Sequence, residues 1–338
     1  MKKLFILFSI FSFLLLSVPA AASFSYNRHG VGLRFSGEGT AGASTPGGFF
    51  PDFRLRGQFN YAAHPGWTAG AVYSIDQLAT STGHYARDAF LLVEGPQGRI
   101  EAGITNSIAT KLGLGLPDVG QLNVNEYNFI YGAMNLDRPM ISNPVIDSAR
   151  YSLRANFATV PTKPFQLGVS IVPWDPNFKY SSDFGLRFRS PHGKTKMAAS
   201  FGTSFIDSPK GLVADLYAPS LTADSRNQIS AGVNVQYRSW NWGLTARGIY
   251  DKNPVGPRSD GLQTGTGISY EFLNYSASVS YMLSEVGVWH RESVTHHTGI
   301  LSLRYKIDRY FSIWASGGMV KTPDKDQPFA AGGLHVRF

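Results

Sequence analysis

Arginines at alternate positions are the residues of this sequence best suited to chemistry. Arg54 and Arg56 lie two residues apart, and Arg150 and Arg154 lie four apart, with apolar side chains at the odd positions between them. A guanidinium keeps its charge and binds carboxylates and phosphates through paired hydrogen bonds. Because residues two apart share one face of a β-strand, this spacing predicts a basic surface that attracts anions.

Other reaction chemistry has little support in the sequence. The chain has no cysteine, which excludes disulfides, thiolate nucleophiles and thiolate zinc sites. His290, His296 and His297 have no clear set of carboxylates beside them, so a metal site is not expected. Serines are too numerous to single out a nucleophile with a histidine and an acid. We therefore expect neither an enzyme nor a protein that needs a cofactor.

The elements that carry the arginines are predicted to be β-strands. Apolar side chains recur at every second residue, for example through 53–61 and 229–237, which is the period of a strand with one wet face. Charged residues make up only 16% of the 338 residues, against about 25% in ordinary globular proteins. Hydrophobic residues make up 43%, so the chain is expected to fold rather than to be disordered.

The alternating runs predict sixteen strands, over residues 29–41, 52–62, 67–77, 84–94, 98–106, 147–157, 164–174, 180–190, 194–205, 227–238, 240–251, 262–272, 274–285, 295–307, 310–320 and 328–338. Their connections alternate between tight turns, such as 64–66, and longer loops, such as 42–51 and 107–146. Short turns at one end and long loops at the other are typical of a transmembrane β-barrel.

A soluble sandwich of two sheets is the alternative, because its strands also alternate. Aromatic residues near the predicted strand ends, including Trp67, Trp240 and Tyr275, favour the barrel, since aromatic residues gather at membrane interfaces. The predicted fold class is therefore all-β, a transmembrane antiparallel up-and-down β-barrel.

The first 22 residues have the features of a cleaved export signal. Lys2 and Lys3 precede an apolar run over 4–18, and 19–22 offer small residues for cleavage. That run is shorter than the roughly 20 residues that a membrane-spanning helix needs. We expect a signal peptide over 1–22 and a mature barrel over 23–338.

Two segments carry a resemblance to a known family. Residues 87–103 (RDAFLLVEGPQGRIEAG) and 147–157 (DSARYSLRANF) resemble the strands before and after the constriction loop of Gram-negative general porins, and Phe338 ends the predicted closing strand. The resemblance implies a water-filled diffusion channel in the outer membrane, commonly a homotrimer, whose third external loop, here about 107–146, folds inward. The second external loop, about 78–83, is shorter than the loop that often latches porin trimers together.

Parity assigns the two faces of the predicted wall. The lipid-facing set is Val31, Leu33, Phe53, Leu55, Phe90, Ile100 and Tyr151. The inward basic set is Arg34, Arg54, Arg56, Arg87, Arg99, Arg150, Arg154, Arg187, Arg189, Lys196, Arg238, Arg247, Arg304, Lys306 and Arg337. The inward acids are Glu38, Asp76, Glu101, Asp183 and Glu271. A basic lumen with a weak anion preference follows, and no outer basic patch is left for nucleic acid.

The resemblance also implies roles for particular residues. In porins an arginine cluster faces loop acids across the constriction, which gives a transverse field that orients dipolar solutes. Those roles map onto the wall residues Arg54, Arg56, Arg87, Arg150 and Arg154 and onto the loop residues Asp118, Glu126 and Asp137. Each arginine could instead solvate the lumen or form a structural ion pair.

The prediction is a porin for passive diffusion of small hydrophilic solutes and ions. A channel specific for a sugar or an anion is one alternative, in which Tyr127, Phe129 and Tyr131 would stack sugars. An enzyme or adhesin mounted on an outer-membrane barrel is the alternative from another class.

Overall fold

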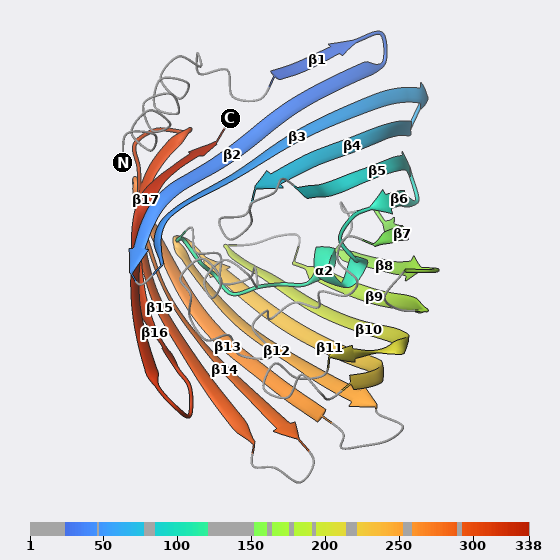
Figure 1. The fold of residues 1–338 in the computed structure, drawn as a ribbon. Helices are drawn as coiled ribbons and strands as arrows, with labels where there is room; N and C mark the ends of the chain where they lie inside the picture. Colours follow the sequence, from blue (N-terminus) through green and yellow to red (C-terminus); the bar gives the residue numbers. More distant parts are fainter. Residues whose placement is uncertain are drawn as a thin grey trace, which may run out of the picture.

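The computed structural model is a closed antiparallel β-barrel (Figure 1). Neighbouring strands pair in chain order, and the pairing of β17 with β2 closes a ring of sixteen. The structure describes residues 24–45, 47–77, 85–120, 152–160, 164–175, 179–190, 194–213, 222–252, 259–288 and 293–337. The expected signal peptide lies outside these residues.

The wall strands are β2 (Val31–Thr45), β3 (Gly48–His64), β4 (Trp67–Gln77), β5 (Tyr85–Gly95), β6 (Gly98–Ile104), β7 (Leu153–Thr159), β8 (Phe165–Val172), β9 (Tyr180–Arg189), β10 (Thr195–Val213), β11 (Thr222–Tyr237), β12 (Trp240–Lys252), β13 (Ser259–Phe272), β14 (Tyr275–Val288), β15 (Val294–Lys306), β16 (Phe311–Lys321) and β17 (Asp326–Arg337). Each corresponds to one predicted strand, so the predicted fold class is confirmed. The strand predicted from 147 is described only from Leu153, because 147–151 lie outside the described residues.

A short additional strand, β1 (Phe24–Arg28), was not predicted. It forms a hairpin with β2 through His29 and Gly30, which have φ angles of 51° and 80°. Both β1 and β17 pair with β2 on the edge opposite β3. The two terminal strands therefore share one position in the wall.

Side chains alternate between an apolar outer face and a polar inner face. In β14, Val279 and Tyr281 are exposed on the outer face, whereas Ser278 and Ser280 are buried on the inner one. Lipid solvates the apolar outer face, so no second sheet has to cover it. The closed ring also pairs the backbone groups for which lipid offers no partner.

The expected faces are wrong in part of β5. Phe90, expected to face lipid, is only 6% exposed and joins Val72 and Leu92 in a buried cluster, while Leu91 is 66% exposed. Residues 90–93 are all apolar, so the alternation of apolar and polar residues cannot show which of them face lipid. The ladder between β4 and β5 also shifts register at residue 87, and such a bulge inverts parity.

Arg238 was expected to face the lumen from a strand, but it does not lie in a strand. Arg238 lies in the turn between β11 and β12 with a φ of 53°, and its guanidinium lies 5.3 Å from the ring centroid of Tyr237.

After β6, whose last paired residue is Ile104, the chain leaves the wall and enters the barrel. Gly103 has a φ of 140°, and a Cβ there would lie 2.3 Å from the carbonyl oxygen of Ala89, so only glycine fits. The short helix α2 (Ile108–Leu112) follows, and its N-cap residue Ser107 accepts a hydrogen bond from the backbone N–H of Thr110. Among the described residues, no helix is long and apolar enough to cross a membrane.

Candidate functional site

Residues 105–120, which we call the inner arm, lie inside the ring of strands (Figure 1). At the start of the arm, the N–H of Ile108 donates to Ser170 Oγ of β8 at 2.6 Å. At its far end, the N–H of Val119 donates to Ser278 Oγ of β14 at 3.1 Å. The arm therefore follows the inner wall from β8 to β14. The rest of the expected constriction loop, 121–146, lies outside the described residues.

Small side chains of the wall make room for the arm. A Cβ at Gly168 would lie 2.6 Å from Ile108 Cγ2, and one at Gly243 would lie 2.5 Å from Pro117 Cδ. Serine hydroxyls between these glycines bond to the backbone of the arm, as Ser200 does to the N–H of Leu114 at 3.0 Å. The wall from β8 to β14 is thus shaped to hold the arm.

Arg187 of β9 fixes the end of α2. Its guanidinium donates to the carbonyl oxygens of Lys111, Leu112 and Gly113 at 2.8, 2.7 and 2.8 Å. The last carbonyls of a helix have no partner within the helix, so this arginine supplies one. Arg187 was expected only as a charge of the lumen.

One carboxylate at the base of the arm is shared by two cations. Arg99 Nε lies 2.9 Å from Glu101 Oε1, and the ammonium of Lys111 bonds to Glu101 Oε2. Lys111 also donates to Thr105 Oγ1 at 2.7 Å. Both cations lie over the ring of Phe90, at 5.8 and 5.2 Å from its centroid. Burial lowers the pKa of Lys111 below its usual range, and the charge of Glu101 opposes that effect.

A recess of about 460 Å³ opens between α2 and the wall strands. Its charged lining residues are the cations Arg56, Arg99, Lys111 and Arg187 and the acids Asp88, Glu94 and Glu101. The recess therefore carries one more positive than negative charge.

Arg54 and Arg56 lie on the inner face of β3. Arg54 Nη1 is 2.7 Å from Glu38 Oε1 of β2, and the same carboxylate lies 3.8 Å from Arg337 of β17. These strands form the side of the barrel away from the described hydrogen bonds of the arm. We call β2, β3 and β17 the basic wall.

Arg154 and Asp118 occupy sheltered positions. Arg154 is 2% exposed, and its Nη1 lies 3.6 Å from Asp183 Oδ2. Asp118 Oδ1 accepts hydrogen bonds from the N–H of Gly120 at 2.9 Å and from Ser278 Oγ at 3.3 Å. The structure thus brings Arg154 to Asp183 and Asp118 to the wall at β14. The described part of the structure does not include the side chain of Arg87. It also does not include the predicted site residues Arg150, Glu126, Asp137, Tyr127, Phe129 and Tyr131.

The histidines lie apart from any described cluster of ligands. His296 is buried on the inner face of β15, and His297 Nδ1 lies 2.5 Å from the hydroxyl of Tyr281. Within the described ranges, no group of three or more histidine, aspartate or glutamate residues could hold a metal ion. His290 falls outside these ranges.

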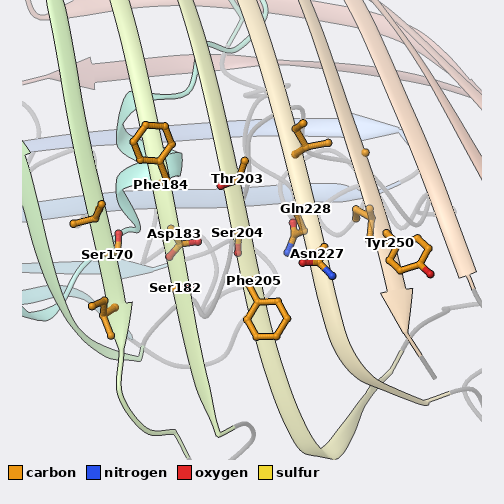
Figure 2. A pocket seen from close by; sticks show the side chains of 15 residues that line it. Ser170, Ser182, Asp183, Phe184, Thr203, Ser204, Phe205, Asn227, Gln228 and Tyr250 are labelled. Atoms are coloured by element: carbon orange, nitrogen blue, oxygen red, sulfur yellow. The ribbon is translucent and has the colours of Figure 1, made fainter. Parts of the chain in front are cut away.

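A larger groove, of about 690 Å³, crosses β8 to β12 on the other face of the wall. Figure 2 shows the side chains of Phe184, Phe205 and Tyr250 at this groove. The side chains of Phe184 and Ile229 are exposed on the outer, lipid-facing side of the wall. This groove therefore lies outside the lumen and is not a candidate for the solute path.

Sequence reasoning missed Lys111 and the structural role of Arg187. Lys111 lies in a loop, where parity assigns no face. The serines at alternate positions 276, 278 and 280 were a usable signal, because a row of inward hydroxyls can anchor a chain inside the barrel.

A closed barrel with an apolar outer face, a polar lumen and an inner arm has the architecture of an outer-membrane channel. A family model described as Gram-negative porin matches residues 19–300. The chain belongs to this family, and the expected resemblance is confirmed. No curated protein matches the sequence.

Solved structures with the same fold include three bacterial outer-membrane proteins. OmpT of Vibrio cholerae in a trimer form is 12% identical, with a TM-score of 0.67 over 91% of this chain and 99% of that one. The anion-selective porin of Comamonas acidovorans is 9% identical, with a TM-score of 0.67 over 91% and 100%. OmpF of Salmonella typhi in complex with daunomycin is 10% identical, with a TM-score of 0.59 over 93% and 100%. At these identities the likeness concerns the fold alone.

Proposed function

We propose that this porin is a passive channel for small hydrophilic solutes and ions, with a weak preference for anions and no enzymatic activity. The excess of positive charge inside the barrel carries this proposal. Among the described side chains of the basic wall, Arg34, Arg54, Arg56 and Arg337 share the inner parity with a single carboxylate, Glu38. Fixed charge in a narrow aqueous pore concentrates ions of opposite sign. The porin of Comamonas acidovorans, which shares the fold, is anion-selective, and this supports the proposal.

Ion selectivity tests this function. Purified protein in planar bilayers under a potassium chloride gradient is expected to give a reversal potential on the anion side, and conductance that rises without saturation as salt increases. Arg34→Gln is expected to reduce the anion preference. Cation selectivity at neutral pH would contradict the proposal, and saturable block by a sugar would favour a substrate-specific channel instead.

We infer that Arg54 and Arg56 form the described part of a constriction that faces the loop acids. Arg87, Arg150, Glu126 and Asp137 remain predicted members of it. The burial of Arg154 against Asp183 supports the structural alternative for that arginine, and the contact of Asp118 with Ser278 supports an anchoring role for that acid. Neutralising Arg56 is therefore expected to change selectivity more than neutralising Arg154, as reversal potentials would measure.

We also propose a homotrimer and a cleaved signal peptide over 1–22. The trimer form of the structurally similar OmpT supports the first proposal. Light scattering of the protein in mild detergent would measure its mass, and a monomer mass would contradict the trimer. Amino-terminal sequencing of protein from outer membranes is expected to begin at Ser23.

A further inference from the structure

We propose that Arg99 and Lys111 form a binding site for small oxyanions, such as inorganic phosphate or the carboxylate of a solute, in the recess beside α2. Anions would bind there transiently as they cross the channel. This inference rests on the proposed channel function and adds a second anion-attracting surface to the basic wall. It assigns Lys111, which parity could not place, to ion selectivity.

The charge balance of the cluster is the first argument. Both oxygens of Glu101 are occupied, Oε1 by Arg99 and Oε2 by Lys111 and by Asn156 Nδ2 at 3.0 Å. One carboxylate cannot neutralise two cations, so the cluster keeps a net charge of about +1. An oxyanion supplies the missing negative charge together with hydrogen-bond acceptors.

The neighbouring groups do not cancel this charge. Glu94 lies 3.7 Å from Arg99, which is beyond hydrogen-bond length, and its side chain is 46% exposed, so water screens it. Arg187 bonds to backbone carbonyls, which carry no full charge. Asp88 is a buried acid of the same lining that attracts Lys111, and the cation Arg56 on that lining offsets its charge, so the charged groups of the recess still carry one more positive than negative charge.

The cluster is also held in place before any anion arrives. Thr105 and Glu101 fix the ammonium of Lys111, while Arg187 fixes the helix that carries it. The Phe90 ring backs both cations on one side and brings no formal counter-charge. The side chains of Arg99 and Lys111 are still 29% and 27% exposed, so an ion can reach them. A preorganised site pays little ordering entropy on binding.

A purely structural role is the competing explanation, in which the ion pairs only pin the inner arm. The two roles differ in the sign of mutational effects. If the cluster only pins the arm, neutralising Lys111 or Glu101 loosens the same contact and shifts selectivity in one direction. If it attracts anions, the two substitutions act in opposite directions, because one removes a positive and the other a negative charge.

The test uses the full-length barrel in planar bilayers under a potassium chloride gradient. Lys111→Gln is expected to lower the chloride-to-potassium permeability ratio roughly fourfold, because one charge about 10 Å from the ion path at the dielectric constant of water changes the partition of each ion about twofold and in opposite directions. Glu101→Gln is expected to raise the ratio by a similar factor, and Lys111→Arg to preserve it. Arg99→Gln lowers the ratio through the other cation, so the test stands if one variant does not fold.

Inorganic phosphate gives a second readout. Added to one side, it is expected to reduce the chloride current of the wild type more strongly than that of Lys111→Gln. Shifts of the same sign for Lys111→Gln and Glu101→Gln, or no shift in either, overturn the inference. If Arg34→Gln still lowers the permeability ratio, the proposed function survives that failure. If the wild type is cation-selective, the proposed function fails, and only block by phosphate that depends on Lys111 would still support the site.

Discussion

At the scale of single residues, the partner of a charged side chain decides its role more than the face it occupies. Arg187 and Arg189 lie two residues apart on the same strand and the same parity. Arg187 bonds to three carbonyl oxygens of the inner arm, whereas Arg189 is exposed. Two inward arginines can therefore differ completely in function.

Arg187→Gln is expected to lower the free energy of unfolding by about 2 kcal/mol, because carbonyl groups at the end of α2 lose a charged donor. Urea titration of the folded barrel, followed by tryptophan fluorescence, measures this change. Arg189→Gln is the matched control and is expected to change stability by less than about 0.5 kcal/mol. Equal effects of the two substitutions would show that Arg187 does not anchor the arm.

Gly103 is a residue whose identity follows from backbone geometry. Gly103→Ala is expected to cost at least about 2 kcal/mol, because it combines a φ of 140° with a Cβ that would meet the backbone of Ala89. Gly299→Ala is the control, since a Cβ at Gly299 has nothing within 4 Å. The fraction of refolded barrel, measured by heat-dependent migration in gels, compares the two. Normal refolding of Gly103→Ala would contradict the assigned strain.

At the scale of elements, the inner arm behaves as part of the wall. Hydrogen bonds and close packing connect it to β8, β9, β10 and β14. An element fixed at so many points is expected to stay in place while the channel conducts.

A disulfide can test whether the arm moves, because the chain has no cysteine of its own. A Cβ at Gly232 would lie 3.0 Å from Leu114 Cβ and 2.9 Å from the Leu114 carbonyl oxygen, closer than the roughly 3.5–4.5 Å between the Cβ atoms of a disulfide, so the arm has to shift by about 0.5 Å for the bond to form. Leu114→Cys combined with Gly232→Cys is expected to form the bond and to give the same single-channel conductance before and after reduction. Each single variant controls for the side-chain changes. A change of conductance on reduction of the double variant alone would show that the arm moves.

The sixteen wall strands were predictable because one of their faces is polar and the other apolar. In β5 that contrast disappears over 90–93, and the local sequence could not choose the face of Phe90. The pairing of β4 with β5 made the choice, through the register shift between Ser74 and Ile75.

At the scale of the whole molecule, lipid takes the place of a second apolar layer. Outward side chains such as Leu301, which is 51% exposed, rely on the membrane for an apolar environment. The same chain in water would expose this surface, so the fold presupposes a bilayer.

Leu301→Arg is expected to lower the free energy of unfolding from lipid vesicles by about 2–4 kcal/mol, because it places a charge on the outer face of the barrel. Leu273→Arg is the control, since Leu273 lies in the turn between β13 and β14 and is 82% exposed. Urea titrations in vesicles measure both variants. If they cost the same, Leu301 does not face the apolar part of the bilayer.

The sequence by itself determined the strand period, the number of wall strands, the tight turns and the basic excess, because each depends on neighbouring residues or on composition. The tertiary structure decided which charges meet. Glu101 reaches Lys111 because the chain turns inward after β6, and Val119 reaches Ser278 because the ring closes around the arm. Such contacts join residues far apart in the chain, and local periodicity carries no information about them.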